Sequence, residues 1–90
     1  MSQLSENAAG LAFRGILAAA ELTIGEAAKP AALYLLVTGG NVPGALAARV
    51  YGCSKQYVSK ALREVEDRRE DPAFDAALAA LERRLFQIEE

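Results

Sequence analysis

The chain has 90 residues, a formal net charge of −2 at pH 7, one cysteine and no histidine, and 52% of its residues are hydrophobic. This length predicts a single domain over 1–90, and this apolar content excludes global disorder. One cysteine cannot form an internal disulfide, and a chain without histidine cannot build a histidine-dependent catalytic dyad. No apolar run reaches the roughly 20 residues needed to span a bilayer. We therefore expect a cytoplasmic protein that is not an enzyme, contacts no membrane and holds no metal, cofactor or small-molecule ligand.

Apolar residues recur along the chain at helical rather than strand-like spacing. The first expected helix runs over about 6–21, and its inward side is expected to hold Leu11, Ile16, Leu17 and, as a further candidate, Phe13. Thr23 and Glu26 then match a capping box. A second helix is expected over about 30–38, and the two glycines at 39–40 end it.

Three more helices complete the expected fold, which is all-α with five helices. The third helix has Pro43 in its first turn and breaks at Gly52. Ser54 is the expected N-cap of a longer helix from 55 to about 69. An Asp-Pro pair then begins a last, amphipathic helix over 72–88.

The stretch over about 43–69 has the spacing of a helix-turn-helix. Such a motif needs a small residue where its helices cross and a residue that tolerates positive φ at the turn. Ala48 and, four residues later, Gly52 fill these two positions. The apolar positions that would hold the second helix on the first are Val58, Ala61 and Leu62. Other helical hairpins also contain an Ala-x-x-x-Gly spacing, so the charge pattern has to be considered with it.

Basic residues are concentrated in the same stretch. Residues 41–63 hold four basic side chains and no acid, whereas residues 64–90 hold nine acids and four arginines. Local potential decides nucleic-acid binding more than net charge does. A polar helix face of this kind is also common as a purely solvated surface. Because this acid-free basic window over residues 41–63 coincides with the motif, we expect the chain to bind double-stranded DNA.

The second helix of the motif would place its N-terminal part in the major groove. Gln56 can pair with adenine, and Lys55 and Lys60 can donate to guanine or to phosphate. Arg49 before this helix and Arg63 along it are expected to contact phosphates. The ring of Tyr57 could pack beside the domain, with its hydroxyl reaching a phosphate. The candidate DNA-binding residues are Arg49, Ser54, Lys55, Gln56, Tyr57, Ser59, Lys60 and Arg63.

Residues from about 35 to 66 resemble a known family. They contain Leu-Val-Thr-Gly-Gly before the motif and Ala-x-x-x-Gly-Cys-Ser-Lys-Gln-Tyr-Val-Ser-Lys-Ala-Leu-Arg-Glu-Val through it. This is similar to the small plasmid-encoded repressors of the Kor (kil-override) group and the related TrfB-type regulators. The resemblance covers about a third of the chain. It implies a homodimeric transcriptional repressor of plasmid genes that binds a palindromic operator, with contacts from Lys55, Gln56, Ser59 and Lys60.

The last helix is the expected dimerisation element. Its large apolar residues are spaced like the a and d positions of a short coiled coil, and they are Phe74, Leu78, Leu81, Leu85 and Ile88. Such a stripe could also pack on the body of the same chain. A dimer is favoured because paired reading helices about 34 Å apart would match half-sites one DNA turn apart. The N-terminal helix, with its alanines at 18–20, is the competing interface.

A protein-interaction module, such as an antitoxin or adaptor, is the alternative function. It would explain the amphipathic last helix and the acidic end of the chain, but it would not need the acid-free basic window. Salt-sensitive binding to DNA distinguishes the two functions, because phosphate contacts make affinity fall as salt rises.

Overall fold

The computed structural model describes residues 6–86, and every regular element in this part of the chain is helical. The elements, in chain order, are α1 (Glu6–Thr23), the short 3₁₀ helix η1 (Gly25–Ala27), α2 (Ala28–Thr38), α3 (Gly44–Tyr51), α4 (Lys55–Arg68) and α5 (Pro72–Phe86). The prediction of an all-α fold with five α-helices is confirmed for these residues. No helix among them is both long and apolar enough to cross a membrane.

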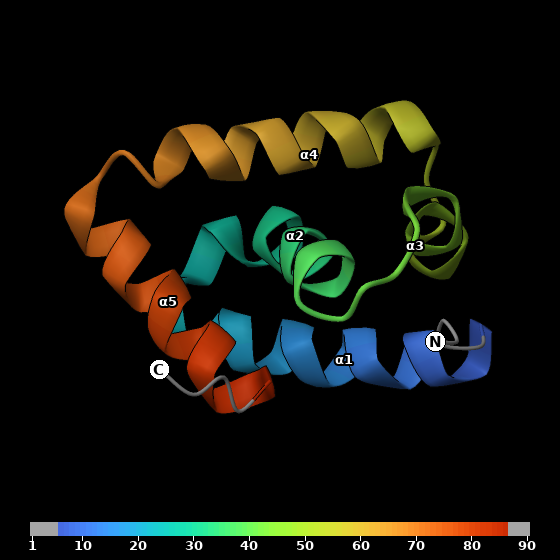
Figure 1. Ribbon diagram of the computed structural model, residues 1–90, viewed down its shortest axis with the longest axis horizontal. Helices are drawn as coiled ribbons and strands as arrows, with labels where there is room; N and C mark the ends of the chain where they lie inside the picture. Colours follow the sequence, from blue (N-terminus) through green and yellow to red (C-terminus); the bar gives the residue numbers. More distant parts are fainter. Residues whose placement is uncertain (1–5, 87–90) are drawn as a thin grey trace.

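Helix α2 is the centre of the fold. It contacts both α1 and α4, so these two helices cover opposite sides of it (Figure 1). Helix α3 lies at the end where α1 and α4 begin, and α5 lies at the other end. This arrangement leaves one side of α1 and one side of α4 facing outward in opposite directions.

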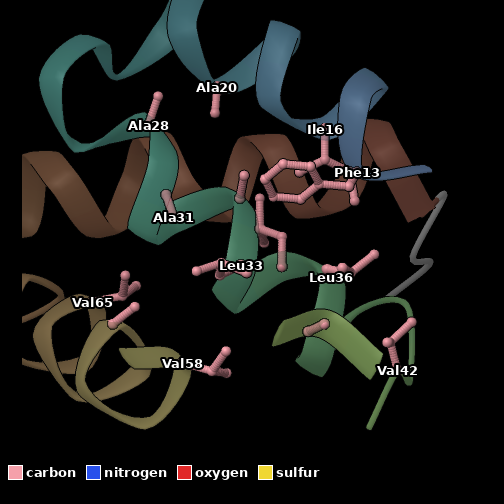
Figure 2. Packing of buried hydrophobic residues seen from close by; sticks show 14 of the residues in the cluster. Phe13, Ile16, Ala20, Ala28, Ala31, Leu33, Leu36, Val42, Val58 and Val65 are labelled. Atoms are coloured by element: carbon pink, nitrogen blue, oxygen red, sulfur yellow. The ribbon is translucent and has the colours of Figure 1, made fainter. Parts of the chain in front are cut away.

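The core forms because α2 is apolar on nearly all sides. Leu33, Leu35 and Leu36 of this helix have no exposed surface. Side chains from the surrounding helices, among them Phe13 and Val58, converge on them (Figure 2). Burying side chains of this size from several helices is the main stabilising contribution to such a fold.

The inward side of α1 differs in part from the one expected. Phe13 and Ile16 are buried, but Leu17 is only half-buried and Leu11 is 68% exposed, so the expectation for Leu11 was wrong. The buried residues of α1 recur at intervals of four, three and four, and they are Ala9, Phe13, Ile16 and Ala20. Small alanines at two of these positions let α1 approach α2 closely, so the helix is oriented by close packing as well as by its larger side chains.

The connection between α1 and α2 also differs from the prediction. The Thr23 hydroxyl donates to the Ala19 carbonyl oxygen at 2.9 Å and therefore extends α1 instead of capping a new helix. Ile24 precedes η1 without a side-chain cap, so the predicted capping box of Thr23 and Glu26 was wrong. Gly25 has a φ of 81°, and η1 leads directly into α2 at residue 28.

The end of α2 confirms the two-glycine stop. The N–H groups of Gly39 and Gly40 both donate to the Leu35 carbonyl oxygen, at 2.8 and 3.0 Å. A Cβ on Gly40 would lie 2.7 Å from the Leu36 carbonyl oxygen, which is backbone and cannot move aside. Pro43 is the residue before α3, so it lies one position outside the first turn in which it was expected.

Arg69 connects three helices at the far end of the molecule. Its guanidinium donates to carboxylate oxygens of Asp75 and Glu82 on α5 and to the Tyr34 hydroxyl on α2. Burial alone would lower the pKa of Arg69, but its hydrogen bonds to Asp75 and Glu82 outweigh that effect and raise it. The guanidinium therefore stays charged and holds α5 against the end of α4.

The apolar side of α5 packs on the body of its own chain. Leu78 and Leu81 are 0% and 1% exposed, and Phe74 and Leu85 are half-buried against the same core. Ile88 lies outside the described residues. Two of the five side chains expected to meet a partner, Leu78 and Leu81, are thus buried within one chain, as in the alternative that the sequence left open.

Candidate nucleic-acid interface

A three-residue turn joins α3 to α4. Gly52 adopts the left-handed conformation, with φ 85° and ψ 39°, and ends α3 at the predicted position. The N–H groups of Gly52 and Cys53 both donate to the Ala48 carbonyl oxygen, at 2.8 and 2.9 Å. Only glycine adopts this conformation without steric cost, so Gly52 allows α4 to leave α3 in a new direction.

Ser54 caps α4, as predicted. Its Oγ accepts a hydrogen bond from the Tyr57 N–H at 3.1 Å, and its backbone is extended. This bond satisfies one of the otherwise unpaired N–H groups in the first turn. Ser54 therefore fixes where the helix begins and so which side chains share its exposed face.

Helix α4 has a buried side and a polar side. Val58, Ala61 and Val65 are buried, with α2 packed against the helix. Exposed polar residues line one shallow hollow on the helix surface, and they are Lys55, Gln56, Ser59, Lys60 and Arg63. We call these five residues the α4 face. The structure thus brings together five of the eight candidate DNA-binding residues.

The sign of the charge changes along α4. Lys60 and Arg63 also border a second hollow, whose other lining residues are Glu64, Asp67 and Arg68. Arg68 Nε lies 3.5 Å from the Glu64 carboxylate, one helical turn earlier, so Glu64 partly offsets the positive charge of Arg68. Positive potential is therefore concentrated in the N-terminal half of the helix, which is the half that a helix inserts into a major groove.

Tyr57 lies beside the α4 face rather than in it. Its ring packs against Tyr51 of α3 and remains 38% exposed. Burial, with a further contribution from Tyr51, raises the pKa of the Tyr57 phenol above its usual value of 10.0. The hydroxyl is therefore protonated near neutral pH and can donate a hydrogen bond to a phosphate oxygen.

Arg49 lies apart from the α4 face. It is exposed in the last turn of α3 and borders a different hollow, between α3 and the N-terminal half of α1. That hollow is lined by Asn7, Gly10, Leu11, Arg14, Arg49 and Val50. The sequence did not single out Arg14, because its neighbourhood depends on how α1 packs against α3. No local pattern in the sequence contains that information.

Comparisons with protein-family models, with curated proteins and with solved structures return no match to the chain. The resemblance to Kor and TrfB-type repressors therefore stays a prediction from the residues that carry it.

Proposed function

We propose that the protein is a sequence-specific DNA-binding repressor that reads the major groove with the α4 face through a helix-turn-helix formed by α3 and α4. The observation that carries this proposal is the α4 face itself, which has three basic and two neutral polar side chains and no acid. These side chains project from the first turns of a capped helix whose other side is fixed on the core. An α-helix fits the width of the major groove, so such a face can reach base edges.

Within this interface the residues have different tasks. Gln56 is exposed in the first turn and can make paired hydrogen bonds to adenine. Lys55, Lys60 and Arg63 can bind phosphate or guanine, and Ser59 is short enough to allow close approach. Contacts to phosphate position the protein on the duplex, whereas contacts to bases give sequence preference. Repression would be steric, because a protein bound at a promoter excludes polymerase.

Homodimerisation on a palindromic operator of plasmid genes, in a cytoplasmic protein, remains part of this proposal. It rests on the sequence resemblance and on the small size of a single reading helix. Leu78 and Leu81 are buried within one chain, so these two side chains are not available for a contact between copies.

A protein-interaction module is the second candidate function. The observation that favours it is the exposure of two leucines on α1, Leu11 at 68% and Leu22 at 91%. Large apolar side chains exposed on one helix side are typical of contact surfaces. This surface lies on the opposite side of α2 from the α4 face, so the two functions can exist in one protein.

A DNA-selection experiment tests the main proposal. The purified protein is incubated with a random duplex library, and the enriched duplexes are titrated in gel shifts at low and moderate salt with unrelated competitor DNA. We expect a competitor-resistant shift that weakens as salt rises, because bound phosphates release counterions. Replacing Lys55 and Lys60 by Gln should abolish the shift. The matched control is Lys29→Gln, at an exposed lysine on α2. A folded protein that enriches no sequence would contradict the proposal.

A further inference from the structure

The outward side of α1 carries the most exposed large apolar side chains among the described residues. Leu22 is 91% exposed and Leu11 is 68% exposed. Gly15 and Ala18 lie between them, and the intervals along the helix are four, three and four residues, so all four share one side. We call these four residues the α1 stripe. The buried residues of α1 occupy the other side of the helix, so the stripe is not needed for the core of one chain.

A hollow lies beside one end of the stripe. It has a volume of about 500 Å³ between α1 and α3, and Gly10, Leu11 and Val50 contribute apolar surface to its lining. Leu22 lies at the other end of the stripe, eleven residues and about 16 Å further along the helix. One end of the stripe therefore offers an exposed side chain, and the other offers a place that could receive one.

We propose that the α1 stripe binds the α1 stripe of a second copy of this chain, with the two helices antiparallel. The order leucine, small residue, small residue, leucine reads the same in both directions, as a two-fold symmetric contact requires. In this register Leu22 of each copy lies against the hollow beside Leu11 in the other copy. Gly15 faces Ala18 at the centre, where small side chains let the helix axes approach closely.

Charged residues next to the stripe support the same register. Arg14 and Glu21 are exposed and seven residues apart, so they lie on the same flank of α1. In the antiparallel pair, Arg14 of each copy comes close to Glu21 of the other. A parallel two-fold pair would instead place this flank of the two copies on opposite sides of the contact, so Arg14 and Glu21 of different copies would not meet. Charge complementarity therefore selects the antiparallel arrangement and a second copy as the occupant.

The pairing has a consequence for DNA binding, and only this consequence rests on the proposed function. Helix α2 lies between α1 and α4, so the stripe and the α4 face point in opposite directions. A pair joined through α1 leaves both α4 faces uncovered and directs them away from each other. Each copy would then bind its own duplex segment, so the α1 contact is separate from the contact that would seat two copies on the half-sites of a palindromic operator.

Sedimentation of the full chain over a range of concentrations tests the pairing. We expect the wild-type chain to form a dimer and Leu22→Ser, which removes the apolar side chain without adding a charge, to raise the dimer dissociation constant by on the order of tenfold or more. Because Leu22 is almost fully exposed, this variant should keep the circular dichroism spectrum and dilute-solution melting temperature of the wild type. A wild-type chain that stays monomeric, or a Leu22→Ser chain that pairs as well as the wild type, would overturn the proposal.

A charge exchange tests the register. Arg14→Glu alone should weaken pairing, and the double change Arg14→Glu with Glu21→Arg should restore it. Failure of the double change to restore pairing would refute the antiparallel register.

Binding to DNA is measured separately on the Leu22→Ser chain, which we expect to keep the single-site affinity of the wild type. Loss of pairing with retained DNA binding supports the inference. Pairing by a wild-type chain that binds no DNA would contradict the proposed function and leave the α1 contact intact.

Discussion

The ring of Tyr57, in the first turn of α4, stacks on the ring of Tyr51, the last residue of α3. The ring centroids are 5.8 Å apart and the ring planes are within 1° of parallel. The ring of Phe13, on α1, packs edge to face against the ring of Tyr51, and their centroids are 5.5 Å apart. Aromatic pairs of this kind contribute beyond their buried area. The three rings therefore connect the start of α4 to α3 and α1.

We predict that Tyr57→Phe separates the packing of this ring from a phosphate contact. The variant keeps the stacked ring, so its free energy of unfolding should stay within about 0.5 kcal/mol of the wild type. It removes a hydroxyl whose raised pKa keeps it protonated, and so able to donate, near neutral pH. Affinity for all duplexes should therefore fall by a similar factor, measured by fluorescence anisotropy. Unchanged affinity would show that Tyr57 serves packing alone.

We predict that Gln56→Ala relaxes preference at one base position. Losing a paired contact to adenine should cost about 1–3 kcal/mol on the selected sequence and much less on duplexes altered at that position. Arg49→Ala is the comparison, because a phosphate contact should weaken binding to every sequence alike and reduce its salt dependence. Binding to a panel of single-base variants measures both effects. An unaltered base profile for Gln56→Ala would mean that α4 enters the groove in another orientation.

We predict that Gly52→Ala destabilises the turn between α3 and α4. At a φ of 85° an alanine side chain costs roughly 1–2 kcal/mol, even though nothing lies within 4 Å of the new Cβ. Gly44→Ala is the matched control, since Gly44 has no positive φ and its Cβ would make an ordinary contact with Val58 at 4.0 Å. Urea denaturation should show a loss for Gly52→Ala and no loss for Gly44→Ala. Equal stability of the two variants would contradict the role assigned to Gly52.

The local signals in the sequence predicted the region around α3 and α4 well. The end of α3 at Gly52 and the cap at Ser54 depend on the conformation and hydrogen bonding of single residues, which the residue type itself specifies. The shared face of Lys55, Gln56 and Ser59 follows from helical periodicity once the start of α4 is known. These features need no knowledge of distant contacts.

Features that depend on packing between helices were predicted less well. Leu11 was expected in the core because it is large and apolar, yet closely packed alanines turn α1 so that it faces outward. The spacing of Leu78 and Leu81 fits a contact within the chain as well as one between chains, so periodicity could not distinguish them. Arg69 was missed for a similar reason. Its partners on α2 and α5 come together only in the folded chain.

We predict that Leu81→Ala lowers the free energy of unfolding by about 2–5 kcal/mol, because it leaves a cavity in the core of a single chain. Leu81 is only 1% exposed in this core, so contacts with solvent cannot replace the packing contacts that its side chain loses. The denaturation midpoint of the variant should shift by the same amount at all protein concentrations. Leu22→Ala, measured in dilute solution, should change stability by no more than about 0.5 kcal/mol. A strongly concentration-dependent effect of Leu81→Ala would instead place this residue between two chains.

We predict that Arg69→Gln loosens α5 from the rest of the fold. The change removes charged hydrogen bonds to Asp75 and Glu82 and the cation–π contact with the Tyr34 ring, whose centroid lies 5.8 Å from the guanidinium carbon. Hydrogen bonds to charged groups contribute about 1.5–3 kcal/mol each when well ordered, and this side chain is 23% exposed. We therefore expect a loss of roughly 1–3 kcal/mol in unfolding free energy, together with faster amide exchange in α5.

Arg84→Gln is the control for Arg69→Gln. It removes the same charge from an exposed position in the last turn of α5 and should change stability by less than about 0.5 kcal/mol. The α4 face ends at Arg63, six residues before Arg69, so Arg69→Gln should keep its affinity for DNA wherever the chain is folded. Equal losses of stability in the two variants would show that Arg69 acts through general charge rather than through its three partners.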